Sequence, residues 1–257
     1  MPMNRFLDKL RSGEVAMGQM VLELFTPGIG PMLAACGLDF VIYDMEHGRC
    51  DIAGVAEMLV SCRGTGITPM ARVPDAENAP LSRILDLGAM GVMVPRVETR
   101  AQMERIVAEL KYAPQGKRGV ALGLAHDLYQ ASGAEYFPEM NAETAVIAII
   151  ETVKGFDNLD EIVSVPGLDV AWVGHYDLTV SMGIPCQFEH PRFLEAMDRL
   201  AAAAAKNNIA CGFLPPTPAA AKHWIGKGFR AISLGSDVGV FLEGVRTFRS
   251  AVVAGAD

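Results

Sequence analysis

The sequence has no dense cluster of lysine and arginine anywhere along its 257 residues. Aspartate and glutamate number 30 against 22 lysine and arginine residues, which gives a formal net charge of -8 at pH 7. Nucleic acids and anionic membranes attract positively charged surfaces, so a chain with this balance is a poor partner for either. We therefore expect the protein to bind neither nucleic acid nor a membrane.

Long apolar runs and paired cysteines are also missing. The uninterrupted apolar runs are short, such as residues 200–205, and fall far below the roughly 20 residues that a membrane-spanning helix needs. Residues 1–13 lack the apolar stretch of a signal peptide and fit an opening helix instead. The five cysteines are scattered without a CxxC pair, which argues against a disulfide framework or a zinc site. A cytoplasmic protein with reduced thiols fits these absences best.

Eight short runs of β-branched and other apolar residues alternate with helical patterns along the chain. Buried parallel strands have this composition, and eight βα units in about 250 residues are typical of a (β/α)8 barrel. We predict one α/β domain over residues 1–257, a (β/α)8 TIM barrel. An open doubly wound sheet is the alternative, but Gly28 and Gly30 lack the third glycine of a dinucleotide-binding loop. The predicted strands cover residues 17–22, 40–44, 69–72, 91–95, 146–151, 170–174, 209–213 and 230–235.

The spacing is irregular at one place, between the fourth and fifth predicted strands. Residues 113–143 are rich in glycine and proline and form a long connection. In a compact domain such a connection is more often an active-site cover or a subunit contact than slack chain. We expect residues 113–143 to have one of these two roles.

Polar side chains stand at the carboxyl ends of several predicted strands. The carboxyl ends of all strands of a (β/α)8 barrel surround one opening, whatever their separation in sequence. We therefore expect these side chains to share one site. They are Asp44, Arg72, Glu151 and Asp177, with His47 three positions after Asp44.

Glu151 and Asp177 are the best candidates for metal ligands. Two carboxylates at one site repel each other unless a cation lies between them, and Mg²⁺ or Mn²⁺ prefers carboxylate oxygens completed by water and substrate. Alternatively, each acid caps the helix that follows it or pairs with a surface lysine. The pattern alone leaves both interpretations open.

His47 and Arg72 are candidate catalytic residues. Imidazole titrates nearest to neutrality, which suits His47 as a general base, although a loop histidine can equally be structural or merely exposed. The planar donors of Arg72 could hold an oxyanion or a carboxylate, or form a salt bridge with an acid such as Asp44. Asp44 adds a further acid to the catalytic candidates. Asp86 has apolar residues on both sides, and the sequence pattern by itself indicates a structural role for it.

A series of short motifs runs along the chain: YDMEH at 43–47, ARVP at 71–74, LDLGA at 85–89, VPRV at 94–97, KRG at 117–119, ET at 151–152, LDEI at 159–162, VGHYDL at 173–178 and SMG at 181–183. Together they resemble the HpcH/HpaI class II pyruvate aldolases, which include 4-hydroxy-2-oxoheptanedioate aldolase and 2-dehydro-3-deoxyglucarate aldolase. The similarity extends from residue 18 to residue 241, and the motifs keep the order found in the family.

The resemblance implies a metal-dependent aldol cleavage that releases pyruvate, or a close analogue, and an aldehyde, without a Schiff-base lysine. It places a divalent metal ion, Mg²⁺, Mn²⁺ or Co²⁺, on Glu151 and Asp177. The proton acceptor falls on His47, and the acid that makes this histidine more basic falls on Asp86. Arg72 matches the residue that stabilises the enolate.

The resemblance also has consequences for substrate binding and assembly. Backbone amides around Tyr176 and Asp177 would receive the carboxylate of the 2-oxo acid. The family implies a homohexamer of swapped dimers, in which the last helix, here residues 238–253, packs on a neighbouring subunit.

Two positions depart from the family pattern. Ile149 stands where the family commonly has glutamine, and His175 and Tyr176 replace the usual Pro-Ala before Asp177. Loss of the amide removes a hydrogen bond worth about 0.5 to 1.5 kcal/mol, so we expect that the substrate, or the way it is held, has changed. We retain Ile149, Tyr176 and Leu214 as substrate-contacting positions, although an apolar residue such as Leu214 could equally belong to the barrel core.

Two other functions remain open. A 2-oxo acid decarboxylase acting on a substrate such as oxaloacetate would use the same enolate of pyruvate. A barrel that binds a small 2-oxo acid without turning it over would need the same metal and carboxylate contacts but no proton transfer.

Overall fold

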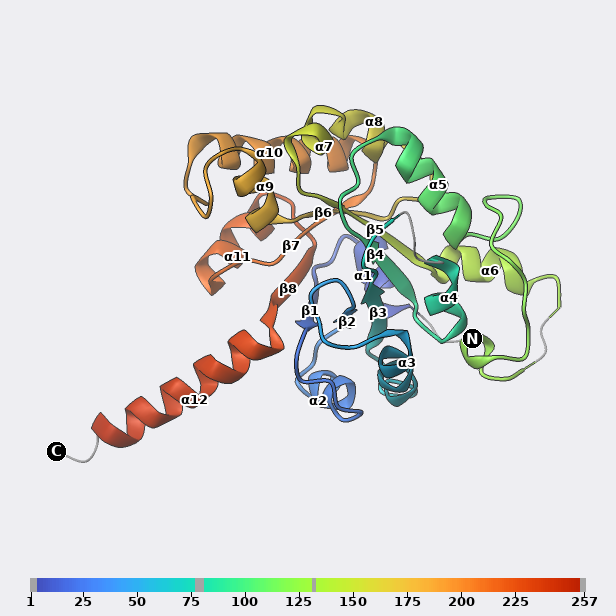
Figure 1. Cartoon of the computed structure of the whole chain (residues 1–257), viewed down its shortest axis with the longest axis horizontal. Coiled ribbons are helices and arrows are strands. Elements are labelled where there is room, and N and C mark those ends of the chain that lie inside the picture. Colours follow the sequence, from blue (N-terminus) through green and yellow to red (C-terminus); the bar gives the residue numbers. More distant parts are fainter. Residues whose placement is uncertain (1–3, 77–80, 131–132, 255–257) are drawn as a thin grey trace.

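The computed structural model describes residues 4–76, 81–130 and 133–254. At its centre, eight parallel strands form a closed barrel in chain order, and β8 pairs with β1 (Figure 1). This architecture confirms the predicted (β/α)8 barrel and excludes the open doubly wound sheet. The strands are β1 (Ala16–Val21), β2 (Phe40–Asp44), β3 (Thr68–Arg72), β4 (Gly91–Val94), β5 (Ala145–Ile150), β6 (Val170–Val173), β7 (Ala210–Phe213) and β8 (Ala231–Ser236).

Helices connect successive strands and surround the barrel (Figure 1). Polar caps mark several helix starts: Asp51 accepts backbone hydrogen bonds at the start of α3, and Thr99 forms a capping box with Gln102 at the start of α5. Proline opens both α10 and α11. The helices are α1 (Arg5–Arg11), α2 (Ile29–Ala35), α3 (Ile52–Ser61), α4 (Leu81–Asp86), α5 (Arg100–Leu110), η1 (Ala125–Asp127), α6 (Tyr136–Glu143), α7 (Val153–Asp157), α8 (Leu159–Val163), α9 (His175–Ser181), α10 (Pro191–Lys206), α11 (Pro218–Gly226) and α12 (Asp237–Ala254).

Alternation along the strands divides the apolar core into two layers. In β2, Phe40 and Ile42 belong to the cluster inside the barrel, whereas Tyr43 belongs to the cluster between the strands and the helices. Phe40 makes edge contacts with Trp172 of β6 and with Phe6 of α1, whose ring centroids lie 6.5 and 4.9 Å away. Because Phe6 packs on the first residue of β2, α1 closes the amino-terminal end of the barrel. The carboxyl ends of the strands remain available for a site.

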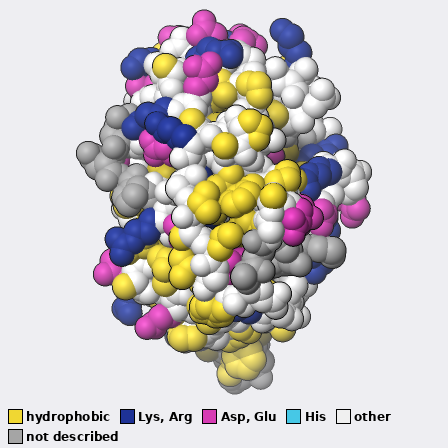
Figure 2. Space-filling view, turned by 90° about the vertical axis from the view of Figure 1, so that its right-hand side faces the viewer, with side chains coloured by type: hydrophobic (Ala, Val, Ile, Leu, Met, Phe, Trp, Pro, Cys, Tyr) yellow, Lys and Arg dark blue, Asp and Glu magenta, His cyan; other side chains and the backbone are white. Residues whose placement is uncertain are grey.

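The described parts of the segment 113–143, residues 113–130 and 133–143, run along the outside of the barrel and include η1 and α6. Arg118 of this segment is buried, and its guanidinium lies over the ring of Tyr112, 4.5 Å from the centroid. Figure 2 views this side of the molecule and shows hydrophobic side chains gathered near its middle. The large exposed apolar side chains among the described residues of the segment are Val120, Leu122, Leu124, Leu128 and Tyr129.

The last helix, α12, projects away from the barrel (Figure 1). Its first residue anchors it, because the carboxylate of Asp237 accepts hydrogen bonds from the backbone N–H groups of residues 22, 23 and 24. Large apolar side chains along the helix are exposed, namely Val240, Phe241, Leu242, Val245, Phe248, Val252 and Val253. Despite these residues, no helix within 4–76, 81–130 and 133–254 combines the length and apolar character needed to cross a bilayer.

Candidate active site

Arg72 and Asp44 meet at the carboxyl ends of β2 and β3. The two residues are paired in register, and Asp44 is fully buried. Nε of Arg72 donates to Oδ1 of Asp44 at 2.8 Å, and Nη2 donates to Oδ2. Burial by itself would lower the pKa of Arg72, but the hydrogen bonds and charge of Asp44 outweigh burial and raise that pKa. The salt bridge that was the alternative interpretation of Arg72 therefore exists, and it fixes the position of the guanidinium.

A tight turn after β2 carries His47. Oδ1 of Asp44 accepts backbone hydrogen bonds from Glu46, at 2.9 Å, and from His47, at 3.3 Å. Gly48 follows in the turn, and a Cβ atom at this position would lie only 2.0 Å from the carbonyl oxygen of Asp44. The side chain of His47 is 60% exposed. Asp44 thus holds both Arg72 and the turn that presents His47.

Glu46 belongs to the same cluster, although it was not among the predicted site residues. Its Oε2 lies 3.1 Å from Nη1 of Arg72, and its Oε1 lies 4.0 Å from Nε2 of His47. Burial raises the pKa of Glu46, and the charges of Arg72 and His47 oppose that rise. The available signal was its place in the YDMEH motif, directly before the histidine.

Glu151 follows β5 directly, and only 4% of its surface is exposed. The backbone N–H of Arg96, a residue with a φ of 53°, donates to its Oε1 at 2.7 Å. Burial raises the pKa of Glu151 to about 7, with smaller contributions from the negative charges of Glu46 and Asp177, against the hydrogen bond from Arg96. Thr152 is the residue that caps α7, so helix capping does not explain Glu151.

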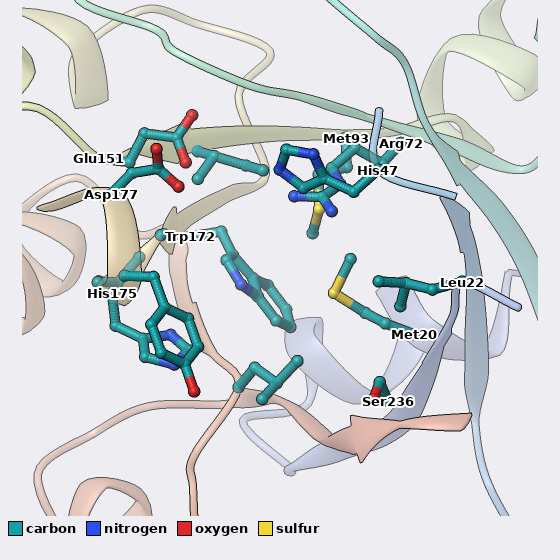
Figure 3. A pocket seen from close by; sticks show the side chains of 15 residues that line it. Met20, Leu22, His47, Arg72, Met93, Glu151, Trp172, His175, Asp177 and Ser236 are labelled. Carbon is teal, nitrogen blue, oxygen red and sulfur yellow. The ribbon is translucent and has the colours of Figure 1, made fainter. Parts of the chain in front are cut away.

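Asp177 lies in the first turn of α9, which begins directly after β6. Its side chain is half exposed, and Oδ1 accepts a hydrogen bond from Nη2 of Arg96 at 3.3 Å. Gly174, the N-cap of α9, lies against the other acid, because a Cβ atom on Gly174 would be 2.2 Å from Oε2 of Glu151. Figure 3 shows the two carboxylates on the same side of a cavity. A residue without a side chain is therefore needed where they approach each other.

The donor set of Glu151 and Asp177 fits a hard divalent cation. A positive charge between the carboxylates would favour the ionised form of Glu151. It would thereby oppose the effects of burial and of the neighbouring negative charges, which raise the pKa of Glu151. In the described part of the chain, no group of three or more histidine, cysteine or acidic residues could hold a metal ion on its own. Mg²⁺ is usually bound by one or two carboxylates, with water and substrate oxygens in its other positions. The two acids therefore suit an ion that also binds the substrate.

A cavity of about 410 Å³ lies between these groups at the carboxyl ends of the strands. Four of the predicted catalytic and metal-binding residues line it, namely His47, Arg72, Glu151 and Asp177, whereas Asp44 lies behind Arg72 and is not part of the lining. The rest of the wall is largely apolar and consists of Met20, Leu22, Met93, Ile149, Trp172, Val173 and Leu214, together with Gly174, His175, Tyr176 and Ser236. In Figure 3, Ser236 lies on the opposite side of the cavity from Glu151, Asp177 and Arg72, and the side chains of Trp172 and Met20 lie between them. The predicted contact positions Ile149, Tyr176 and Leu214 are thus all at the cavity.

Met20, Met93 and Trp172 are three of the lining residues that were not predicted. Each belongs to the cluster inside the barrel and comes from a different strand. The period-two alternation of each strand gives the signal, since inward-facing positions near the carboxyl end must lie beneath any site there.

His175 is one of the lining residues, and its ring packs within an aromatic cluster. Its ring lies among those of Tyr176, Phe188 and Phe213, with centroids 4.4 to 5.2 Å away. Burial lowers the pKa of His175 to about 4, so the imidazole is neutral at neutral pH. Its Nε2 is buried and has no hydrogen-bond partner among the described residues. Tyr176 is more than half exposed and remains able to meet a substrate.

The structure does not bring Asp86 to this cavity within one chain. Asp86 ends α4, and its carboxylate accepts a hydrogen bond from Nη2 of Arg118 at 2.6 Å. Its backbone carbonyl lies 3.3 Å from Nδ1 of His126. Both partners belong to residues 113–143, and no described residue of that segment lines the cavity. The implied contact between Asp86 and His47 is therefore absent from the described chain, where Glu46 is the acid that faces His47.

The fold and the site define a class of protein, a (β/α)8-barrel enzyme whose paired carboxylates, arginine and histidine suit chemistry on a carbonyl compound. The family model described as HpcH/HpaI aldolase/citrate lyase matches residues 20–244. The chain belongs to this family and is a carbon–carbon lyase of the aldolase type.

Individual relatives agree with this assignment. The chain is 31% identical over 243 residues to 5-keto-4-deoxy-D-glucarate aldolase from Salmonella arizonae, a match that covers 95% of this chain and 94% of the relative. A solved HpcH/HpaI aldolase/citrate lyase family protein from Burkholderia cenocepacia has a TM-score of 0.89 and 31% identity, covering 97% of this chain and 99% of that one. An HpcH/HpaI aldolase from Desulfitobacterium hafniense gives a TM-score of 0.88, with 29% identity and 95% of both chains covered. These matches confirm the family resemblance drawn from the motifs.

Proposed function

We propose that the protein is a divalent-metal-dependent aldolase that cleaves a 4-hydroxy-2-oxo acid into pyruvate, or a close analogue, and an aldehyde. The observation that carries this proposal is the presence, around one cavity, of the Glu151 and Asp177 carboxylates together with Arg72 and His47. The relative from Salmonella arizonae is named as an aldolase of a keto-deoxy sugar acid, which supports a substrate of this general class.

Each end of the 2-oxo acid has a group that can hold it. Glu151 and Asp177 would bind Mg²⁺, Mn²⁺ or Co²⁺, and the bound cation supplies the Lewis acidity that stabilises negative charge on the substrate oxygens. Arg72, already oriented by Asp44, would donate to the oxygen on which that charge develops. Backbone amides around Tyr176 and Asp177, in the first turn of α9, would receive the carboxylate.

His47 would accept the proton of the 4-hydroxyl group. As this O–H bond breaks, its electron pair forms the carbonyl of the aldehyde, and the electrons of the C3–C4 bond move to the 2-oxo acid half, which becomes an enolate. The protonated imidazole of His47 would then return this proton to C3, which gives pyruvate and restores the neutral base. Glu46, with Oε1 4.0 Å from Nε2 of His47, would stabilise the protonated imidazole. Glu46 would thereby supply within one chain the effect that the family resemblance assigns to Asp86.

We also propose a cytoplasmic homohexamer in which α12 packs on a neighbouring subunit. The exposed apolar side chains of α12 and of residues 113–143 support this arrangement, because soluble proteins seldom leave large contiguous apolar patches uncovered. Light scattering on the eluting protein tests it: six copies of the 27.5 kDa chain are expected, and a monomer would refute the assembly.

The test of the proposed activity compares chelated and metal-reloaded protein. Exchange of the pyruvate methyl protons with D₂O, followed by proton NMR, measures proton transfer without knowledge of the aldehyde. We expect exchange with Mn²⁺ or Mg²⁺ and none after chelation, and exchange that survives complete chelation would refute the proposal. Faster pyruvate release from oxaloacetate than from any hydroxy-oxo acid would instead indicate a decarboxylase. Metal-dependent pyruvate binding without exchange would indicate a binding protein.

A further inference from the structure

We infer that the aldehyde handled at this site is uncharged and apolar, an aliphatic or aromatic aldehyde rather than one that carries a second carboxylate. This inference rests on the proposed function and adds the class of its second substrate. It separates the protein from the relative named for a glucarate, since a glucarate carries a carboxylate at each end.

The part of the cavity wall on which we place the aldehyde is lined by apolar side chains from its buried base to its rim. Four of its side chains are almost completely buried and come from β1, β4, β5 and β6, and two half-buried leucines follow β1 and β7. Because these side chains come from separate strands, the apolar surface extends across the end of the barrel and is not confined to one loop. These side chains are Met20, Met93, Ile149, Trp172, Leu22 and Leu214.

The cavity has little positive charge to offer a second carboxylate. Arg72 is the only lysine or arginine among the described residues that line it. An arginine has five N–H donors, and three of those of Arg72 face Asp44 and Glu46. The two that remain are enough for one oxygen of the 2-oxo acid. Arg96 lies outside the lining and contacts Asp177. A carboxylate on the aldehyde would therefore find no cation in the described lining beyond Arg72 and the metal ion, both of which the 2-oxo acid already engages.

The cavity also has few neutral polar groups for a polyhydroxylated chain. Ser236 and Tyr176 provide the hydroxyl groups of the described lining, whereas Nε2 of His175 is shielded within the aromatic cluster. Each hydroxyl group of a sugar acid would lose its water on entering and find few partners, which disfavours such a substrate. An alkyl chain or a phenyl ring loses no hydrogen bonds there and gains contact with Trp172, Met20 and Leu22.

Condensation of pyruvate with matched aldehydes tests the inference on the metal-loaded protein. Butanal and succinic semialdehyde differ by the change of a terminal methyl to a carboxylate, and benzaldehyde and 4-carboxybenzaldehyde form a second pair. We expect kcat/KM to be at least about tenfold higher for the neutral member of each pair. From propanal to pentanal, each added methylene is expected to raise kcat/KM by about fourfold.

A substitution in the cavity wall tests whether the lack of positive charge there causes the expected preference for neutral aldehydes. Leu214 is half-buried at the end of β7, so a longer side chain there can reach the cavity without entering the core. In Leu214→Arg, the preference for butanal over succinic semialdehyde is expected to fall by at least about tenfold. The control Leu214→Met keeps the wall apolar and is expected to retain the wild-type order of aldehydes.

The outcomes separate this inference from the proposed function. If pyruvate exchanges its methyl protons in a metal-dependent way but succinic semialdehyde equals or exceeds butanal, the inference is overturned and the proposed chemistry stands. The inference is also overturned if pyruvate exchanges its methyl protons but no neutral aldehyde condenses with it. If no exchange occurs, the proposed function fails and the inference fails with it.

Discussion

Replacing Glu151 by glutamine is expected to stabilise the metal-free protein at alkaline pH. The pKa of Glu151 is raised from its ordinary 4.5 to about 7, a difference equivalent to about 3 kcal/mol in favour of the protonated form. Below pH 4.5 the carboxyl group is protonated in both the folded and the unfolded chain, so it has no effect on stability. Between pH 4.5 and 7 the unfolded chain releases the proton while the folded protein keeps it, and stability falls as pH rises. Above pH 7 the full cost of about 3 kcal/mol applies.

Urea denaturation in the presence of a chelator measures this effect. Glutamine cannot ionise and retains an oxygen for the backbone N–H of Arg96, so Glu151→Gln should exceed wild type by about 3 kcal/mol at pH 8 and by about 1 kcal/mol at pH 5. Glu104→Gln is the matched control, because Glu104 is half exposed on α5, and a change within about 0.5 kcal/mol is expected there. The same difference between Glu151→Gln and wild type at both pH values would refute the reasoning.

Three further predictions concern the site. His47→Ala should bind Mn²⁺ as wild type does in calorimetry but lose at least about 100-fold in kcat, as expected for a general base; loss of metal binding would contradict the proposed role. Arg72→Lys should also lose at least about 100-fold in kcat/KM, because an ammonium group cannot reproduce the two-point contact of a guanidinium, and near-normal rates would exclude that role. Gly174→Ala should weaken Mn²⁺ binding about tenfold or more by displacing Glu151, whose Oε2 would lie 2.2 Å from the new Cβ atom. The control Gly119→Ala places its Cβ atom in open space, and equal effects of the two changes would reject this explanation.

The barrel could be predicted from the sequence because its strands are buried on both faces. Runs such as 40–44 and 145–150 are buried at every position, so they appear in the sequence as continuous β-branched and apolar stretches. The residues that end these runs then fall at one opening by the geometry of the fold, which is why Asp44, Arg72 and Glu151 could be grouped from the sequence.

The contacts of individual side chains could not be predicted in this way. Asp86 and Glu46 are both acids within a motif, and only the position of the chain around Arg118 gives Asp86 its partner. Glu46 turns back to Arg72 because of a short turn held by Asp44. Such pairings depend on where a loop lies in space, and the spacing of residues does not encode it.

Anomalous diffraction from crystals soaked in Mn²⁺ would show whether Glu151 and Asp177 together hold a divalent cation. We expect an anomalous peak between the two carboxylates, within bonding distance of an oxygen of each, and the loss of that peak in Asp177→Ala crystals. A peak elsewhere in the cavity, or one that persists unchanged in Asp177→Ala, would contradict this metal site.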